Sequence, residues 1–302
     1  MSTNITMSFE EFCSKVVGYF KEKYPEARVT VRKITKNNGL ILTGLTVQKG
    51  ESVLPIIYLE RYWKLFRNSE DLPAVFKEID KALSSKIEFP NLSPEDIKDF
   101  DKVKDWLCLR VINKKKNEEK LKTMPYITVL DLAVVFYIYF GNGASIEIND
   151  SFLEGWNIDK EKFIKEYIPI AMVNTNRILP CNVFNMVQFI DSVVNTKAEE
   201  KEIVEDIMYV MTNPAKYYGA VGIAAEGMKL KKFAEDHKSG FYIIPSSVHE
   251  LILVLGDHNR KDSKSLYRMV REVNRTCVDP DEVLSDNVYY FDRELGYPVI
   301  AE

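Results

Sequence analysis

The spacing of apolar side chains along the chain predicts several amphipathic helices. Residues 9–24 show helical spacing directly after Ser8 and Glu11, whose separation is typical of a capping box. Further helices are predicted at residues 72–83, 159–176, 180–194 and 263–274. In the last of these, the side chains expected to face the core are Leu266, Met269, Val270 and Val273.

Alternating and continuous apolar runs predict antiparallel strands. Two hairpins are expected, within residues 28–47 and 127–148. The first turns at Asn38-Gly39, a pair that tolerates positive φ, and the second turns at residues 141–143. The first arm of the second hairpin is almost wholly apolar, which is typical of a central strand buried on both faces.

Helices that alternate with antiparallel hairpins favour an α+β fold. We place a division near residue 150, where the second hairpin ends, which gives subdomains 1–150 and 151–302. The two could share one core, because no stretch rich in proline, glycine or serine marks a hinge at that point.

Composition narrows the class of protein. The chain has 302 residues, of which 46% are hydrophobic and 28% charged, the balance of a globular protein with a sizeable core. Its formal net charge is −4, which makes nucleic acid an unfavoured partner, since general binding to phosphate backbones needs a basic surface. The sequence leaves the oligomeric state open.

The cysteines and the apolar runs predict a cytoplasmic protein without a membrane segment. Four cysteines lie far apart without a CxxC pair, which favours reduced thiols over a disulfide framework. The N-terminus lacks the pattern of a signal peptide. The longest apolar run, residues 129–140, is too short to span a bilayer.

The sharpest candidate site lies within residues 241–254, where two apolar runs meet through a polar turn. Ser247 and His249 are two residues apart and share a face if the stretch is extended, so they could act as nucleophile and base. The carboxylate could come from Glu250, from Asp131 or from another residue. Ser246 adds a second hydroxyl for binding. The structural alternative, which we favour, is that the hydroxyls cap a turn and the histidine bonds to the backbone.

Basic residues on one face of the predicted helix 263–274 form a second candidate, for phosphate or an acidic partner. The stripe consists of Lys264, Arg268, Arg271 and Arg275. Acidic residues follow directly, so a solvated, salt-bridged face is the favoured alternative. The charge-dense run 114–122 is also expected to be a solvated face.

Amide side chains sit beside apolar runs, and histidines are few. We expect the amides to bond buried backbone groups, with a ligand pocket as the less favoured alternative. They are Asn113, Asn117, Asn174 and Asn274, the last a candidate binding residue. The three histidines show no metal-ligand spacing, so neither a metal nor a cofactor is predicted.

Several segments resemble an uncharacterised family of proteins from anaerobic gut bacteria, catalogued only as a domain of unknown function. The resembling segments are residues 55–59, 111–119, 130–133, 174–175, 209–213, 244–250, 269–274 and 282–286. One departure is Tyr126, where the family leads us to expect histidine. The resemblance covers nearly the whole chain and implies a cytoplasmic, single-chain architecture without a known mechanism.

These observations favour a non-enzymatic binding or interaction protein of the bacterial cytoplasm, whose partner is a protein or a small molecule. A hydrolase or transferase that uses Ser247 with His249 is the alternative. Nucleic-acid contact through the basic face of residues 263–275 is a weaker one.

Overall fold

The computed structural model describes residues 7–48, 56–84, 96–141, 143–194, 207–258 and 260–301, except for the side chains of residues 191–194 and 260–262. The chain divides into two compact units, residues 1–90 and 91–302. The division expected near residue 150 falls inside the second unit. There, helix α7 (Lys160–Ile178) packs on strand β4 (Leu107–Asn113), and the backbone N–H of Leu109 donates to Thr175 Oγ1 over 2.8 Å.

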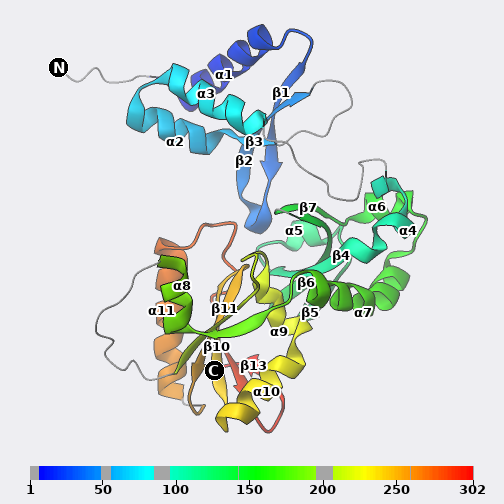
Figure 1. Ribbon diagram of the computed structural model, residues 1–302, viewed down its shortest axis with the longest axis vertical. Coiled ribbons are helices and arrows are strands. Elements are labelled where there is room, and N and C mark those ends of the chain that lie inside the picture. Colours follow the sequence, from blue (N-terminus) through cyan, green and yellow to red (C-terminus); the bar gives the residue numbers. More distant parts are fainter. Residues whose placement is uncertain are drawn as a thin grey trace, which may run out of the picture. The chain divides into compact units, whose positions relative to one another are not determined.

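The described residues of the first unit form three α-helices and a three-stranded antiparallel sheet (Figure 1). Its elements are α1 (Phe9–Lys23), β1 (Arg28–Thr35), β2 (Ile41–Gln48), β3 (Ile57–Tyr58), α2 (Leu59–Ser69) and α3 (Leu72–Leu83). The predicted capping box is confirmed, because Ser8 and Glu11 exchange side-chain to backbone hydrogen bonds at the start of α1. The hairpin turn is also confirmed, with positive φ at Asn38 and Gly39.

One sheet of the second unit is built around β6 (Leu132–Gly141). This strand pairs with β4 on one side, and with β5 (Tyr126–Val129) and β7 (Ala144–Glu147) on the other. Residues 132–140 are all buried, which confirms the predicted central strand. The apolar run is not one strand, however, since a turn with Leu130 at a φ of 56° separates β5 from β6.

The second sheet of this unit has six antiparallel strands in the order β13-β12-β10-β11-β9-β8. They are β8 (Asn182–Asn185), β9 (Met208–Thr212), β10 (Phe241–Ser247), β11 (Glu250–Leu255), β12 (Tyr289–Asp292) and β13 (Tyr297–Ile300). The helix predicted over residues 180–194 is therefore wrong at its start, because residues 182–185 pair with β9 and only α8 (Met186–Val194) is helical. The apolar run of residues 203–211 also predicts a strand; residues 208–211 belong to β9, and residues 203–206 lie outside the described residues.

Helices α10 (Gly227–His237) and α11 (Arg260–Thr276) cover opposite faces of the six-stranded sheet (Figure 1). The α10 ring of Phe233 lies 5.0 Å from that of Phe241, whereas α11 packs on the face that carries the next residue, Tyr242. The core face predicted for α11 is too wide: Val270 is buried, but Met269 and Val273 are 44% and 40% exposed. A single row of side chains that includes Val270 therefore packs α11 against the sheet.

Both faces of the four-stranded sheet are also covered. Helix α7 lies on one face, where Phe163 contacts Phe136 of β6 with ring centroids 4.9 Å apart. On the other face, Leu121 of the short helix α5 (Glu118–Leu121) joins a cluster with Ile112 and Val135. None of the helices in the described part of the chain is long and apolar enough to cross a membrane.

Asp131, in the turn between β5 and β6, fastens the segment that leads into β12. Its carboxylate accepts from Ser285 Oγ at 2.6 Å, from Asn287 Nδ2 at 3.0 Å and from Tyr289 Oη at 2.6 Å. Burial and the neighbouring Asp131 raise the pKa of Tyr289, so its hydroxyl remains protonated and donating. This network joins the two sheets of the second unit.

We expect Asp131→Ala to destabilise the second unit by about 3 kcal/mol, because hydrogen-bond donors would be left buried without their acceptor. Hydrogen exchange followed by mass spectrometry should show faster exchange in β6 and β12. Asp236→Ala is the matched control, since among the described residues Asp236 pairs only with exposed Lys232 one turn away, a contact worth about 0.5 kcal/mol or less. Equal effects of the two substitutions would contradict the assigned role of Asp131.

Candidate functional site

The turn between β10 and β11 holds the candidate serine and histidine. Ser247 is buried at the end of β10, opposite Glu250, and its Oγ accepts from the backbone N–H of His249 over 3.0 Å. Ser246 Oγ donates to the Glu250 carboxylate over 3.3 Å. Both hydroxyls therefore form hydrogen bonds within the turn, which is the usual role of serine in such a position.

The His249 ring has partners other than Ser247. Its Nδ1 accepts from the backbone N–H of Tyr218 over 3.2 Å, and its Nε2 lies 3.4 Å from the Glu282 carboxylate. The ring is parallel to that of Tyr218, with an angle of 4° and centroids 5.6 Å apart. The structure thus brings His249 together with Tyr218 and Glu282, neither of which the sequence had indicated.

A tight loop before residue 220 holds this turn in place. Thr212 Oγ1 donates to the backbone carbonyl of His249 over 2.9 Å, and a Cβ on Gly219 would lie 2.5 Å from that same oxygen. Only glycine permits so close an approach. Tyr218 adopts a φ of 54°, an unfavourable conformation for a bulky residue, which the surrounding contacts maintain.

Behind Tyr218 lies a group of charges around the buried Arg110. Arg110 Nη1 donates to Tyr218 Oη over 2.5 Å, and the guanidinium carbon lies 4.6 Å from the ring centroid. Arg110 also pairs with Glu147, which Lys120 contacts at 2.6 Å. Burial raises the pKa of the nearby Tyr137 hydroxyl. Since these charges compensate one another, we assign the group to the stability of the fold.

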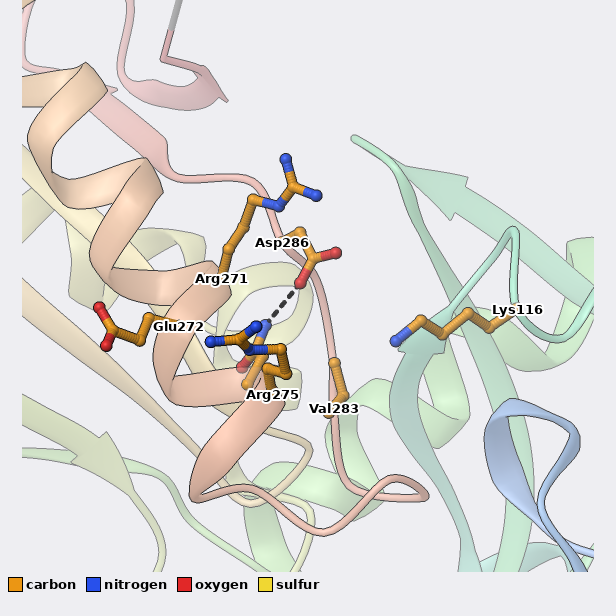
Figure 2. Close-up of a pocket in the computed structure, with 7 residues that line it drawn as sticks. Lys116, Arg271, Glu272, Arg275, Val283 and Asp286 are labelled. Carbon is orange, nitrogen blue, oxygen red and sulfur yellow. Dashed lines mark hydrogen bonds between the residues drawn. The ribbon is translucent and has the colours of Figure 1, made fainter.

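A cavity of about 560 Å³ lies between α11 and the loop that follows β4 (Figure 2). The lining residues are Lys116, Arg271, Glu272, Asn274, Arg275, Val283 and Asp286. Figure 2 shows Lys116 extending from the loop toward α11, while the Glu272 carboxylate points away from Lys116. The cavity, which we call the α11 cavity, is thus lined by segments more than 150 residues apart in sequence.

Positive charge dominates the α11 cavity. Arg271 and Arg275 are one turn apart on α11, so they face the same side, and Lys116 adds a third cation. The guanidinium of Arg271 lies 5.6 Å from the Tyr267 ring. Neither Lys116 nor Arg275 forms a side-chain ion pair with another described residue. Of the two carboxylates, Asp286 is already engaged by Asn274 Nδ2 at 2.9 Å.

Amides fix the two sides of this cavity. The backbone N–H of Lys116 donates to Asn113 Oδ1 over 2.7 Å, while Asn113 Nδ2 donates to the carbonyl of Leu284 over 2.9 Å. From the other side, Asn274 Nδ2 donates to the carbonyl of Ser285 over 2.9 Å. Asn117 and Asn174 likewise donate to backbone carbonyls, so the prediction made for all four amides is confirmed.

The structure separates the candidate residues into two groups. Ser246, Ser247, His249 and Glu250 lie at the β10–β11 turn. Arg271 and Asn274 line the α11 cavity, whereas Arg268, one turn earlier, is exposed and does not line it. Lys116 joins the cavity although sequence reasoning had treated its segment as a solvated run, and only the fold reveals that proximity. No three His, Cys, Asp or Glu side chains in the described segments are placed to hold a metal ion.

A family model described as a family of unknown function matches residues 9–293. The chain belongs to this family, DUF5688. No curated protein and no solved structure matches the chain. The resemblance to a domain of unknown function is thus confirmed, and the DUF5688 match includes both the β10–β11 turn and the α11 cavity.

The hydrogen bonds predict opposite neutral tautomers for two histidines of this DUF5688 protein. His249 Nδ1 accepts from an N–H, so its proton must lie on Nε2, facing Glu282. His237 Nδ1 lies 2.9 Å from the carbonyl of Phe233, which can only accept, so its proton must lie on Nδ1. Long-range ¹⁵N–¹H correlation spectra at a pH where both rings are neutral will distinguish the two forms.

Assignment of the two ring signals by His249→Gln and His237→Gln provides the control. The same tautomer in both rings would contradict the hydrogen bonds described here. A ring signal of His249 that changes its tautomer in Ser247→Ala would show that the hydroxyl and the imidazole are coupled, contrary to the separate partners that the structure gives them.

Proposed function

We propose that this protein is a non-enzymatic binding protein whose ligand is a small molecule with several negative charges, held in the α11 cavity. The observation that carries the proposal is the convergence of Lys116, Arg271 and Arg275 on one cavity, without ion pairs to other described residues for Lys116 and Arg275. Three cations that face one space favour an anion with more than one charge.

The arrangement of the two arginines supports an anionic ligand. Like charges four residues apart on a helix destabilise it by about 0.2–0.5 kcal/mol, and an anion between Arg271 and Arg275 would remove that repulsion. The guanidinium fork also matches the oxygens of phosphate or carboxylate in a bidentate manner. Lys116, opposite α11, would contribute a compact point charge.

The size and composition of the cavity support binding rather than catalysis. A volume of about 560 Å³ lies within the range of small-molecule sites, about 300–1,000 Å³. The described residues that line it include no serine, cysteine or histidine, and of the two carboxylates Asp286 is engaged by Asn274 while Glu272 points away from Lys116. The net charge of −4 favours a small ligand over nucleic acid.

The proposed setting is the cytoplasm of a bacterium. Two observations support it. All four cysteines are free thiols, and burial raises the pKa of Cys108 to about 12 and that of Cys181 to about 11. Free thiols without a disulfide framework are typical of proteins from reducing compartments. Burial makes Cys108 and Cys181 unreactive as well.

We expect the protein to bind inorganic tripolyphosphate, and Arg275→Gln to weaken that binding about tenfold. One hydrogen bond from a charged group is worth about 1.5–3 kcal/mol. Salt screens the charges that line this cavity, so we expect a loss at the lower end of that range. Isothermal titration calorimetry at 50 mM and 200 mM salt measures the affinity and its salt dependence, which should be steep in the wild type.

Arg268→Gln is the matched control, since Arg268 lies on the same helix but does not line the cavity. It should change the affinity less than threefold. Equal losses in the two variants would indicate a diffuse surface effect, and absence of tripolyphosphate binding at 50 mM salt would refute the proposed function.

A further inference from the structure

A second cavity is lined by chain neighbours of Lys116, which lines the α11 cavity. It has a volume of about 550 Å³ and is lined by Lys114 and Lys115, whereas the next residue, Lys116, lines the α11 cavity. Adjacent Cα atoms are about 3.8 Å apart, so the turn of residues 114–116 contributes to the walls of both cavities. We call the second space the Tyr126 cavity, after the aromatic residue that lines it.

The floor of the Tyr126 cavity is apolar and rigid. Leu121, Tyr126 and Leu130 line it. The Tyr126 ring packs against the buried cluster that contains Ile112 and Val135, yet remains partly exposed. A ring held against the core on one side presents a fixed surface on which a flat ligand can stack at little entropic cost.

Lysine side chains also line the Tyr126 cavity. Lys114 and Lys115 form no side-chain ion pairs with other described residues, although Lys122 pairs with Glu119 at 2.7 Å. The carboxylate of Asp131 also lines the cavity, but three donors from residues 285–289 already occupy it. Glu118 is the remaining carboxylate of the lining. The Tyr126 cavity thus combines an aromatic platform with two unpaired cations.

Hydrogen bonds fix the two cavities relative to each other. Asn113 bonds both to the turn of Lys116 and to Leu284, and the backbone N–H of Lys114 donates to the carbonyl of Asp131 over 3.4 Å. Asp131 in turn holds Ser285. These hydrogen-bonded segments therefore form a wall of both cavities. The α11 cavity and the Tyr126 cavity are thus parts of one preorganised surface.

We propose that the ligand is a nucleotide, with its phosphates in the α11 cavity and its base on Tyr126; this inference rests on the proposed function. A nucleoside polyphosphate combines the two features that the cavities complement, a flat ring and several adjacent negative charges. Lys114 and Lys115, which line the Tyr126 cavity and precede Lys116 of the α11 cavity, would contact the groups that join base and phosphates. Base stacking on an aromatic side chain tolerates different bases, so purine and pyrimidine nucleotides both bind.

The test compares tripolyphosphate with ATP and CTP by calorimetry, without divalent ions, in the wild type and in Tyr126→Leu. We expect the wild type to bind ATP about tenfold more tightly than tripolyphosphate, because of stacking. Tyr126→Leu should remove that advantage and leave tripolyphosphate binding unchanged, whereas Tyr126→Phe should preserve it. Arg275→Gln should weaken the binding of tripolyphosphate and nucleotides alike.

The outcomes separate this inference from the proposed function. Two results would overturn the nucleotide assignment and leave the anion site standing. One is tripolyphosphate binding without any preference for ATP. The other is an equal loss of both ligands in Tyr126→Leu and in Tyr126→Phe. Absence of tripolyphosphate binding overturns the proposed function itself. A single-stranded oligonucleotide that binds more tightly than ATP, with losses in both variants, would replace the small ligand by nucleic acid. Unchanged thermal unfolding of Tyr126→Leu and Tyr126→Phe confirms that the variants fold.

Discussion

The carboxylate of Asp131 is the contact on which the second unit depends most. It sits in a turn that Leu130 makes possible by adopting a positive φ, and it accepts hydrogen bonds from Ser285, Asn287 and Tyr289. Hydrogen bonds to a charged acceptor are worth about 1.5–3 kcal/mol each, well above those between neutral groups. Because its donors come from the segment that enters β12, the carboxylate ties the four-stranded sheet to the six-stranded one.

The candidate site follows from that connection. Residues 283–286 would otherwise be a free loop after α11, but Asp131 and Asn113 draw this segment against the β4 side of the unit. Asn274 holds the same segment from the α11 side. The cavity is therefore the space left between two elements whose separation is set by buried hydrogen bonds. The two segments that carry the cations thus keep their separation without a ligand, which reduces the entropic cost of binding.

The β10–β11 turn illustrates a different use of polar residues. Its serines, histidine and glutamate resemble the components of a catalytic group in sequence. In the structure Ser246 bonds to Glu250, Ser247 to the backbone, and His249 to neighbouring chain segments. A histidine that accepts from Tyr218 N–H and faces Glu282 links the turn to two other segments. Such polar connections favour one arrangement of packed elements over others, because their directional bonds are lost when an element shifts.

The sequence by itself determined the elements whose signals are local. The capping box at Ser8, the Asn38-Gly39 turn and the buried run of β6 depend on neighbours a few residues away, so their patterns specified α+β architecture. It also singled out Arg271 and Asn274, because the spacing of polar residues along a helix is readable.

Only the tertiary structure decided the strand at residues 182–185, whose pairing with β9 overrides a helical pattern, and the exposure of Met269 and Val273. It alone also brought Lys116 to the arginines of α11 and gave His249 its partners, since contacts between residues 30 to 160 positions apart depend on how the chain packs and leave no periodic signal in the sequence.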